Sequence, residues 1–155
     1  MAEVVAIIVA AGRGSRAGEG LPKQYRRIAG RTVLARTLDT VLGHASIDAV
    51  VCAIHPDDRD LYRDATSDVR FSERLLAPAT GGATRQDSVG NVLEELARRG
   101  IAPRLCLVHD AARMFADAAI FDRAVAAGSA HGAAGPGIAV TDTMKRIGAG
   151  GEVLG

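Results

Sequence analysis

Residues 4–25 read VVAIIVAAGRGSRAGEGLPKQY, and this stretch decides the fold. Its first six residues form a continuous apolar run, which predicts a strand covered on both faces within a parallel sheet. The loop that follows carries the cations Arg13, Arg16 and Lys23 and the glycines Gly12, Gly14, Gly18 and Gly20. Glycine lets the backbone approach a ligand closely, and unpaired N–H groups attract phosphate oxygens. The stretch therefore predicts a buried strand followed by a loop that binds a polyphosphate.

Apolar runs alternate with helical patterns along the rest of the chain. The expected elements are strands at residues 49–54, 105–108 and, more weakly, 75–77, and helices at residues 33–42, 57–68, 88–99 and about 117–130. This alternation is typical of an α/β, Rossmann-like fold with a mostly parallel sheet and helices on both faces. Such sheets bind ligands beyond the carboxyl ends of their strands. The loops expected to bind are therefore those at residues 10–25, 81–85 and 109–113.

The end of the sequence has a different pattern. Residues 137–140 and 143–147 are expected to be extended, residues 148–151 to form a turn, and residues 152–154 to begin a returning strand. We interpret this as a protruding β-arm that starts at about residue 137 and is cut at Gly155. Residues 1–155 are accordingly expected to form a single domain that is incomplete at its C-terminus, as a fragment of a longer protein would be.

The composition of the chain limits the kinds of binding partner that can be expected. The chain has 155 residues, of which 48% are hydrophobic and 24% charged, as is usual for one folded globular domain. A net charge of +1 offers no electrostatic footprint for a nucleic acid or a membrane surface. No apolar run approaches the roughly 20 residues of a membrane span, and no basic leader precedes residues 4–11. Neither a nucleic acid nor a membrane is expected as a partner.

The cysteines and histidines do not form a metal-binding pattern. Cys52 and Cys106 lie in apolar stretches, at a spacing that suits neither a redox pair nor a zinc site. We expect both thiols to be small core side chains of a cytoplasmic protein. The four histidines are scattered without the paired spacing of a zinc-binding helix.

The glycine loop fits neither common nucleotide-binding fingerprint. Gly12, Gly14 and Ala17 satisfy the dinucleotide pattern G-x-G-x-x-G/A, but Gly18, Gly20 and Pro22 would break the helix that this pattern requires. The lysine pattern of P-loop proteins is absent as well. Lys23 stands out because, of nineteen basic residues, only Lys23 and Lys145 are lysines. Either chance explains this rarity of lysine, or position 23 needs the compact, movable ammonium group of a lysine instead of a guanidinium group.

Four blocks of sequence resemble one family. AAGRGSRAGEGLPKQY (10–25) resembles the signature loop of the sugar-nucleotidyltransferases, and its PKQY ending resembles the 2-C-methyl-D-erythritol 4-phosphate cytidylyltransferases. GGATRQDSV (81–89), LVHDAAR (107–113) and VTDTMKR (140–146) agree with that family in order and spacing. The resemblance implies a nucleotidyltransferase fold that transfers a cytidylyl group from CTP to methylerythritol phosphate with Mg²⁺ present. It also implies a homodimer joined through the arm.

The resemblance also assigns roles to individual residues. Arg16 and Lys23 would be catalytic, and Arg113 would bind the methylerythritol phosphate together with Thr143 from a partner subunit. Asp110 would lie near the ribose and bind Mg²⁺, for which a hard oxygen ligand is suited. The nucleotide would be bound by Ala10, Ala11, Gly12, Gly14, Gly82, Ser88 and Asp110.

Several alternatives remain open at this level. Asp87 or Ser88 could cap the helix that begins there, and for Ser88 this role is as well supported as nucleotide binding. Asp110 could cap the turn after its strand. Arg85 is expected to order a loop rather than to catalyse. The acceptor could instead be a related polyol phosphate such as ribitol 5-phosphate. Two alternatives belong to other functional classes: a nucleotide-binding remnant without activity, and an NAD-dependent oxidoreductase.

Overall fold

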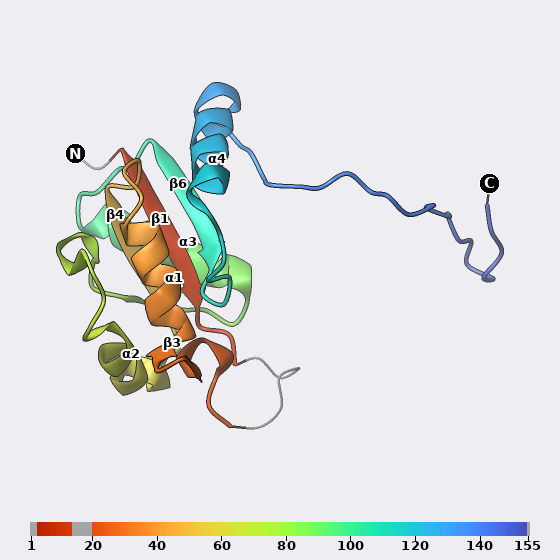
Figure 1. Cartoon of the computed structure of the whole chain (residues 1–155). Coiled ribbons are helices and arrows are strands. Elements are labelled where there is room, and N and C mark those ends of the chain that lie inside the picture. Colours follow the sequence, from red (N-terminus) through yellow and green to blue (C-terminus); the bar gives the residue numbers. More distant parts are fainter. Residues whose placement is uncertain (1–2, 14–19, 155) are drawn as a thin grey trace.

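The computed structural model describes residues 3–13 and 20–154, and its centre is a four-stranded parallel sheet (Figure 1). The strands are β1 (Val4–Ala10), β4 (Ala49–Ile54), β5 (Ala79–Thr80) and β6 (Leu105–Asp110), arranged in the order β5-β4-β1-β6. Strand β1 lies between β4 and β6, with Ile7 opposite Val51 on one side and Val108 on the other. The predicted α/β fold is confirmed.

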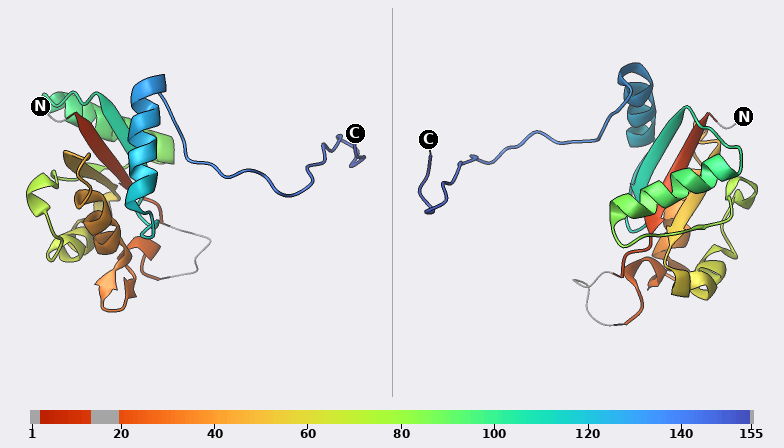
Figure 2. Two further views of the ribbon diagram at one scale, coloured as in Figure 1. Left: turned by 45° about the horizontal axis from the view of Figure 1, so that its top comes forward. Right: turned by 180° about the vertical axis from the view of Figure 1, so that it is seen from behind.

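Helices cover both faces of the sheet (Figure 2). The side chains of β1 alternate between the faces, so Ala6 and Ile8 pack with Leu34 and Leu38 of α1, whereas Ile7 packs with Val92 of α3. The helices are α1 (Val33–Leu42), α2 (Arg59–Thr66), α3 (Arg85–Arg98) and α4 (Ala118–His131), with short 3-10 helices η2 (Lys23–Tyr25), η3 (Pro56–Asp58) and η4 (Ser72–Arg74). Helices α1, α2 and α4 contribute to the first face and α3 to the second.

Most predicted elements are found close to their expected bounds. Helix α1 coincides with residues 33–42 because Thr32 caps it: its side chain accepts a hydrogen bond from the Ala35 N–H. Helix α4 begins after the cap Asp117 and ends at Gly132, as expected. Strand β6 extends two residues further than predicted, to Asp110. Cys52 is fully buried in β4, and Cys106 in β6 is half-buried.

Two elements differ from the sequence-based expectation. The strand predicted at residues 75–77 is wrong: Leu75 forms only an isolated bridge to Val50, and the edge strand is β5. A small antiparallel hairpin, β2 (Arg27–Ile28) with β3 (Arg31–Thr32), was not predicted. Its two-residue turn has positive φ at both Ala29 and Gly30, and alanine at the first position hid the usual glycine or asparagine signal.

Residues 133–154 extend away from the sheet (Figure 1). Their one bridge is antiparallel, between Ile147 and Val153, and the Gly151 N–H donates to the Gly148 carbonyl in the turn between them. The turn and the returning chain therefore agree with the predicted start of a hairpin, although no regular strand forms at residues 137–140. Whether this segment serves as a dimerisation arm stays a prediction. Among the described helices, none is long and apolar enough to cross a membrane.

Candidate active site

A cleft of about 870 Å³ opens at the carboxyl ends of β1 and β6. The chain runs from β1 outward to β4 and β5, and then returns to add β6 on the other side of β1. Ligands of open α/β sheets bind at such a switch in strand order. Loops after β1, β5 and β6 line the cleft, with the side chains or backbone of Ala10, Ala11, Gly12, Arg13, Lys23, Gln24, His55, Gly82, Thr84, Arg85, Ser88, Asp110 and Arg113 among them.

The first loop is held by a buried glutamine. Gln24 is 2% exposed, and its amide Nε2 donates to the carbonyls of Ala10 at 2.7 Å and Gly12 at 3.3 Å. These bonds fix the backbone that follows β1, where Ala10, Ala11 and Gly12 are expected to surround phosphates. Sequence analysis missed Gln24, because its position in PKQY does not reveal that it faces inward. Gly14 and Arg16, also expected to act here, lie outside the described residues.

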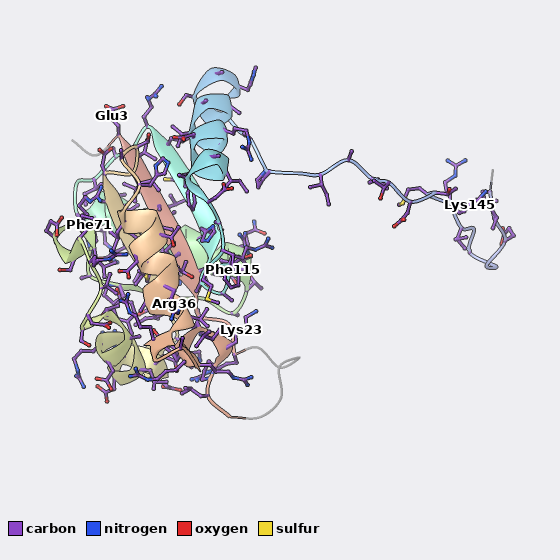
Figure 3. All side chains as sticks on the ribbon, viewed as in Figure 1. Glu3, Lys23, Arg36, Phe71, Phe115 and Lys145 are labelled. Atoms are coloured by element: carbon purple, nitrogen blue, oxygen red, sulfur yellow. The ribbon has the colours of Figure 1, made fainter. Side chains whose placement is uncertain are left out.

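Lys23 begins η2 and lines the same cleft. Within residues 3–13 and 20–154, the Lys23 side chain makes no hydrogen bond or ion pair, whereas its backbone carbonyl accepts a hydrogen bond from the Arg26 N–H. Its ammonium group is therefore available to a bound anion. Figure 3 shows the two lysines far apart, with Lys23 near the end of the sheet and Lys145 on the extended segment.

The second loop approaches the first through glycine. A Cβ atom at Gly81 would overlap the Ala11 Cβ, so only glycine allows this contact between the loops. The Gly81 N–H donates to the Ile54 carbonyl at 2.8 Å, and the Gly82 N–H donates to Ser88 Oγ at 3.0 Å. Ser88 is buried, so its hydroxyl lies under this loop at the base of the cleft.

The expected cap of α3 was wrong. The cap is Thr84, whose side chain accepts from the Asp87 N–H while the Asp87 carboxylate accepts from the Thr84 N–H. The helix consequently begins at Arg85, three residues earlier than predicted. Ser88 instead donates to the Thr84 carbonyl at 2.9 Å. Its expected role in nucleotide binding stays a prediction.

The third loop presents Asp110 between two arginines. Its Oδ1 accepts from Arg85 Nε at 3.0 Å, and its Oδ2 accepts from Arg113 Nε at 2.8 Å. Partial burial opposes ionisation of Asp110, but these two hydrogen bonds outweigh it and lower its pKa. The side chain does not cap the following turn, which is closed by a backbone bond from Arg113 to Asp110 at 3.0 Å. The carboxylate is thus charged and oriented toward the cleft.

Arg13 does not offer the free positive charge expected of it. Its Nη1 donates to Asp58 Oδ1 at 2.8 Å, and its Nη2 donates to His55 Nδ1 at 2.7 Å and Asp57 Oδ2 at 3.3 Å. Two carboxylates therefore neutralise its guanidinium. Of the loop cations that the structure describes, Lys23 is the one left for phosphate.

The residues present suit a metal ion that arrives with the nucleotide. Asp110 is the one carboxylate that lines the cleft in the described part of the chain. Within those same residues, no group of three or more potential metal ligands occurs. Mg²⁺ is commonly bound by one or two carboxylates together with substrate phosphates, and Asp110 fits that mode rather than a cage made by protein alone.

Comparison with known proteins decides the family. The sequence matches the family described as IspD, 2-C-methyl-D-erythritol 4-phosphate cytidylyltransferase, over residues 4–155. The chain belongs to this family. Two relatives, each named as a bifunctional enzyme IspD/IspF, are similar to it. That of Rhodopseudomonas palustris is 50% identical over 149 residues, and that of Nitrobacter hamburgensis is 51% identical over 148 residues.

Solved structures of the IspD family share the fold. A 4-diphosphocytidyl-2C-methyl-D-erythritol synthase superposes with a TM-score of 0.78 and 28% identity, covering 100% of this chain and 69% of that one. The 2-C-methyl-D-erythritol 4-phosphate cytidylyltransferase of Francisella tularensis gives a TM-score of 0.69 at 27% identity, covering 98% of this chain and 64% of that one.

The alignments cover very different shares of the two sequences. They span 96% of this chain but only 36% of the Rhodopseudomonas palustris enzyme and 35% of the Nitrobacter hamburgensis enzyme. The chain thus corresponds to little more than a third of these relatives, within the part that the IspD family describes.

One residue expected from the IspD resemblance is not brought to the cleft. Thr143 is exposed on the segment that extends from the body, as are Lys145 and Arg146. In contrast, Lys23, Gly82, Ser88, Asp110 and Arg113 come together from three separate loops. The described lining of the cleft thus comes from a single copy of the chain, and Thr143 is not part of it.

Proposed function

We propose that the protein transfers a cytidylyl group from CTP to 2-C-methyl-D-erythritol 4-phosphate and releases pyrophosphate. The observation that carries this proposal is the convergence at one cleft of the backbone of residues 10–12, the Lys23 ammonium, which no described residue pairs, and the Asp110 carboxylate held by two arginines. Membership of the IspD family supports the choice of nucleotide and acceptor.

The chemistry needs positive charge and positioning more than it needs a proton donor. A phosphate oxygen of the acceptor attacks the α-phosphorus of CTP, the new P–O bond forms, and the bond to pyrophosphate breaks. Negative charge grows on the α-phosphoryl oxygens and on the leaving pyrophosphate. Lys23 would stabilise that charge, while the N–H groups near Gly12 would hold the triphosphate. Arg113 would face the acceptor phosphate, which keeps the two reacting phosphates in line.

Asp110 would hold Mg²⁺ together with the triphosphate oxygens. When bound, the ion would neutralise part of the phosphate charge. Arg85 and Arg113 each donate to one Asp110 oxygen, which leaves the other lone pairs of both oxygens for a ligand. This arrangement would keep the carboxylate in one orientation before the nucleotide binds.

A second subunit would complete the acceptor site. The exposed apolar side chains of Ile138, Val140 and Met144 are 69–96% exposed on the extended segment, and contact with another copy of the chain would bury them. That contact would bring Thr143 toward the acceptor phosphate of the partner. The reduced thiols Cys52 and Cys106 favour the cytoplasm as the setting.

Turnover with defined acceptors tests the proposal. The full-length gene product is incubated with CTP, Mg²⁺ and either 2-C-methyl-D-erythritol 4-phosphate or ribitol 5-phosphate, and pyrophosphate and the cytidine diphosphate product are measured. We expect product with methylerythritol phosphate alone. Turnover with ribitol 5-phosphate alone would show that the acceptor is ribitol phosphate and not methylerythritol phosphate. CTP binding without turnover of either acceptor would indicate a nucleotide-binding protein without activity.

A further inference from the structure

Asp58 is a buried carboxylate beside the glycine loop, and the proposed chemistry does not use it. It ends η3, the turn that follows β4, and it is 1% exposed. Its Oδ1 accepts the 2.8 Å hydrogen bond from Arg13, and Arg13 is the one cation that pairs with it in the described residues. Removing a carboxylate from water is costly unless a cation compensates. The pair therefore binds Arg13 firmly to η3.

The Arg13 side chain connects the start of the glycine loop, through hydrogen bonds, to the segment that follows the neighbouring strand β4. It directly follows Gly12, whose carbonyl is already held by Gln24. All three side-chain partners of Arg13, namely His55, Asp57 and Asp58, come from the four residues that follow β4. A backbone segment with so many contacts to a rigid sheet has little freedom to move.

The far end of the loop lies close to the segment that carries Asp58, because η2 contacts α2, the helix that Asp58 precedes. Tyr25 closes η2, two residues after Lys23, and is 2% exposed. Burial, and next the negative charge of Asp58, raises the pKa of the Tyr25 hydroxyl. The Tyr25 hydroxyl and Asp58 Oδ2 are both buried without a hydrogen-bond partner among residues 3–13 and 20–154.

We propose that Asp58 is a positioning residue for the nucleotide: by pairing with Arg13 it holds the backbone beside Gly12 against the segment 56–66, which η2 also contacts. This contact would keep the Gly12 backbone in the position at which it binds the triphosphate of CTP. Asp58 itself does not touch the reacting atoms. The inference rests on the proposed function, because it assumes that CTP binds at this loop.

CTP affinity of an Asp58→Asn variant tests the inference. The substitution keeps the size of the side chain and removes the charge that holds Arg13. We expect the Kd for CTP, measured by calorimetry, to rise about tenfold, as is typical for residues that act through a network.

Asp39 offers a matched control for the loss of a buried charge. It is also buried and paired with an arginine, Arg31, but it lies on α1 and does not line the cleft. Asp39→Asn should lower the melting temperature and leave the Kd for CTP unchanged at a temperature where both variants are folded. A general loss of stability therefore cannot account for a change confined to Asp58→Asn.

Variants of Arg13 break the same ion pair from its other side, so they test the inference even if Asp58→Asn does not fold. Arg13→Gln should weaken CTP binding about as much as Asp58→Asn, and Arg13→Lys, which retains a charge, should restore part of it. The double variant should bind no more weakly than the weaker single variant, because both changes break one interaction.

The outcomes separate this inference from the proposed function. Absence of CTP binding by the wild-type protein overturns both. If the wild type binds CTP, then unchanged affinity in Asp58→Asn or Arg13→Gln overturns the positioning role alone. Losses in the two single variants that simply add in the double variant also overturn it.

Discussion

The cleft at the end of the sheet and the extended segment 133–154 both carry sequence blocks of the same family, yet their structures differ. In the cleft, three loops converge over a buried sheet, and hydrogen bonds from Gln24, Arg85 and Ser88 hold them in place. In the segment, the side chains of Ile138 and Met144 are almost wholly exposed. A motif thus specifies its own geometry only where the chain's own core supports it.

This difference has a physical origin in burial. Strand β1 is covered by helices on both faces, so the loop after it begins from a rigid support. The extended segment buries little apolar surface against the body, and its backbone is held by the few bonds of the Gly148–Gly151 turn. Substitutions in pairs, one in each region, measure how far this contrast holds.

The largest difference is expected between substitutions of the two lysines, Lys23 and Lys145. Lys23→Ala should reduce turnover about 10²–10³-fold, because it removes a positive charge from the site of charge development. Its fold should be unchanged, since Lys23 makes no contact that an alanine would break within the described residues. Lys145→Ala is the matched control and should retain full turnover in the same pyrophosphate-release assay. Comparable turnover of Lys23→Ala and the wild type would remove Lys23 from the mechanism.

A paired isoleucine substitution tests the difference in burial. Ile8→Ala should lower the free energy of unfolding by about 2–5 kcal/mol, because it opens a cavity in a fully buried strand. Ile138→Ala should change it by less than about 0.5 kcal/mol, as expected for a surface substitution. Urea denaturation followed by circular dichroism measures both. Similar losses in the two variants would mean that the segment packs on the body.

Paired glycine substitutions test the close approach of the loops. Gly81→Ala should cost about 1–3 kcal/mol of stability, because its methyl group would overlap Ala11. Gly137→Ala is the control, since nothing lies within 4 Å of a Cβ built there. The thermal midpoints of the two variants should therefore separate. A Gly81→Ala protein as stable as the wild type would show that the loops can move apart.

The smallest effect concerns the ionisation of Asp110. Its pKa is lowered in the folded protein, so its charge stabilises the fold at neutral pH, and this contribution is lost as the pH falls through the lowered pKa. Arg85→Gln removes one of the two opposing hydrogen bonds and should raise that pKa. A carbon-13 NMR titration of the Asp110 carboxyl group measures the shift. An identical titration curve in the variant would mean that Arg113 alone sets the pKa.

The sequence predicted most of the sheet because apolar runs and burial coincide. Residues 4–9 and 49–54 are continuously apolar, and both proved to be buried strands. The strand at residues 75–77 was wrong because a short edge strand has no distinctive pattern. Leu75 and Ala79 both pair with β4, and where the chain runs along the sheet decides that only residues 79–80 form a strand. The β2–β3 hairpin escaped prediction for a similar reason, since its strands are only two residues long.

The sequence predicted several residues of the site but not the contacts among them. Lys23, Gly82, Ser88, Asp110 and Arg113 were selected from sequence and line one cleft. The contacts among the side chains were not foreseen, because they join residues far apart in the chain. Arg85 and Asp110 are 25 positions apart, and Arg13 and Asp58 are 45 positions apart.

The sequence by itself determined the order of the longer strands and of the helices α1 to α4, the glycine-rich character of the first loop and the family to which the chain belongs. These features depend on local patterns of apolar residues, glycines and charges. Only the tertiary structure decided which charges remain free: it pairs Arg13 with a buried carboxylate, holds Asp110 between two arginines and leaves Lys23 open to the cleft. The reason is that the state of a charged side chain depends on its neighbours in space, and several of these come from distant segments of the chain, such as η3 for Arg13 and α3 for Asp110.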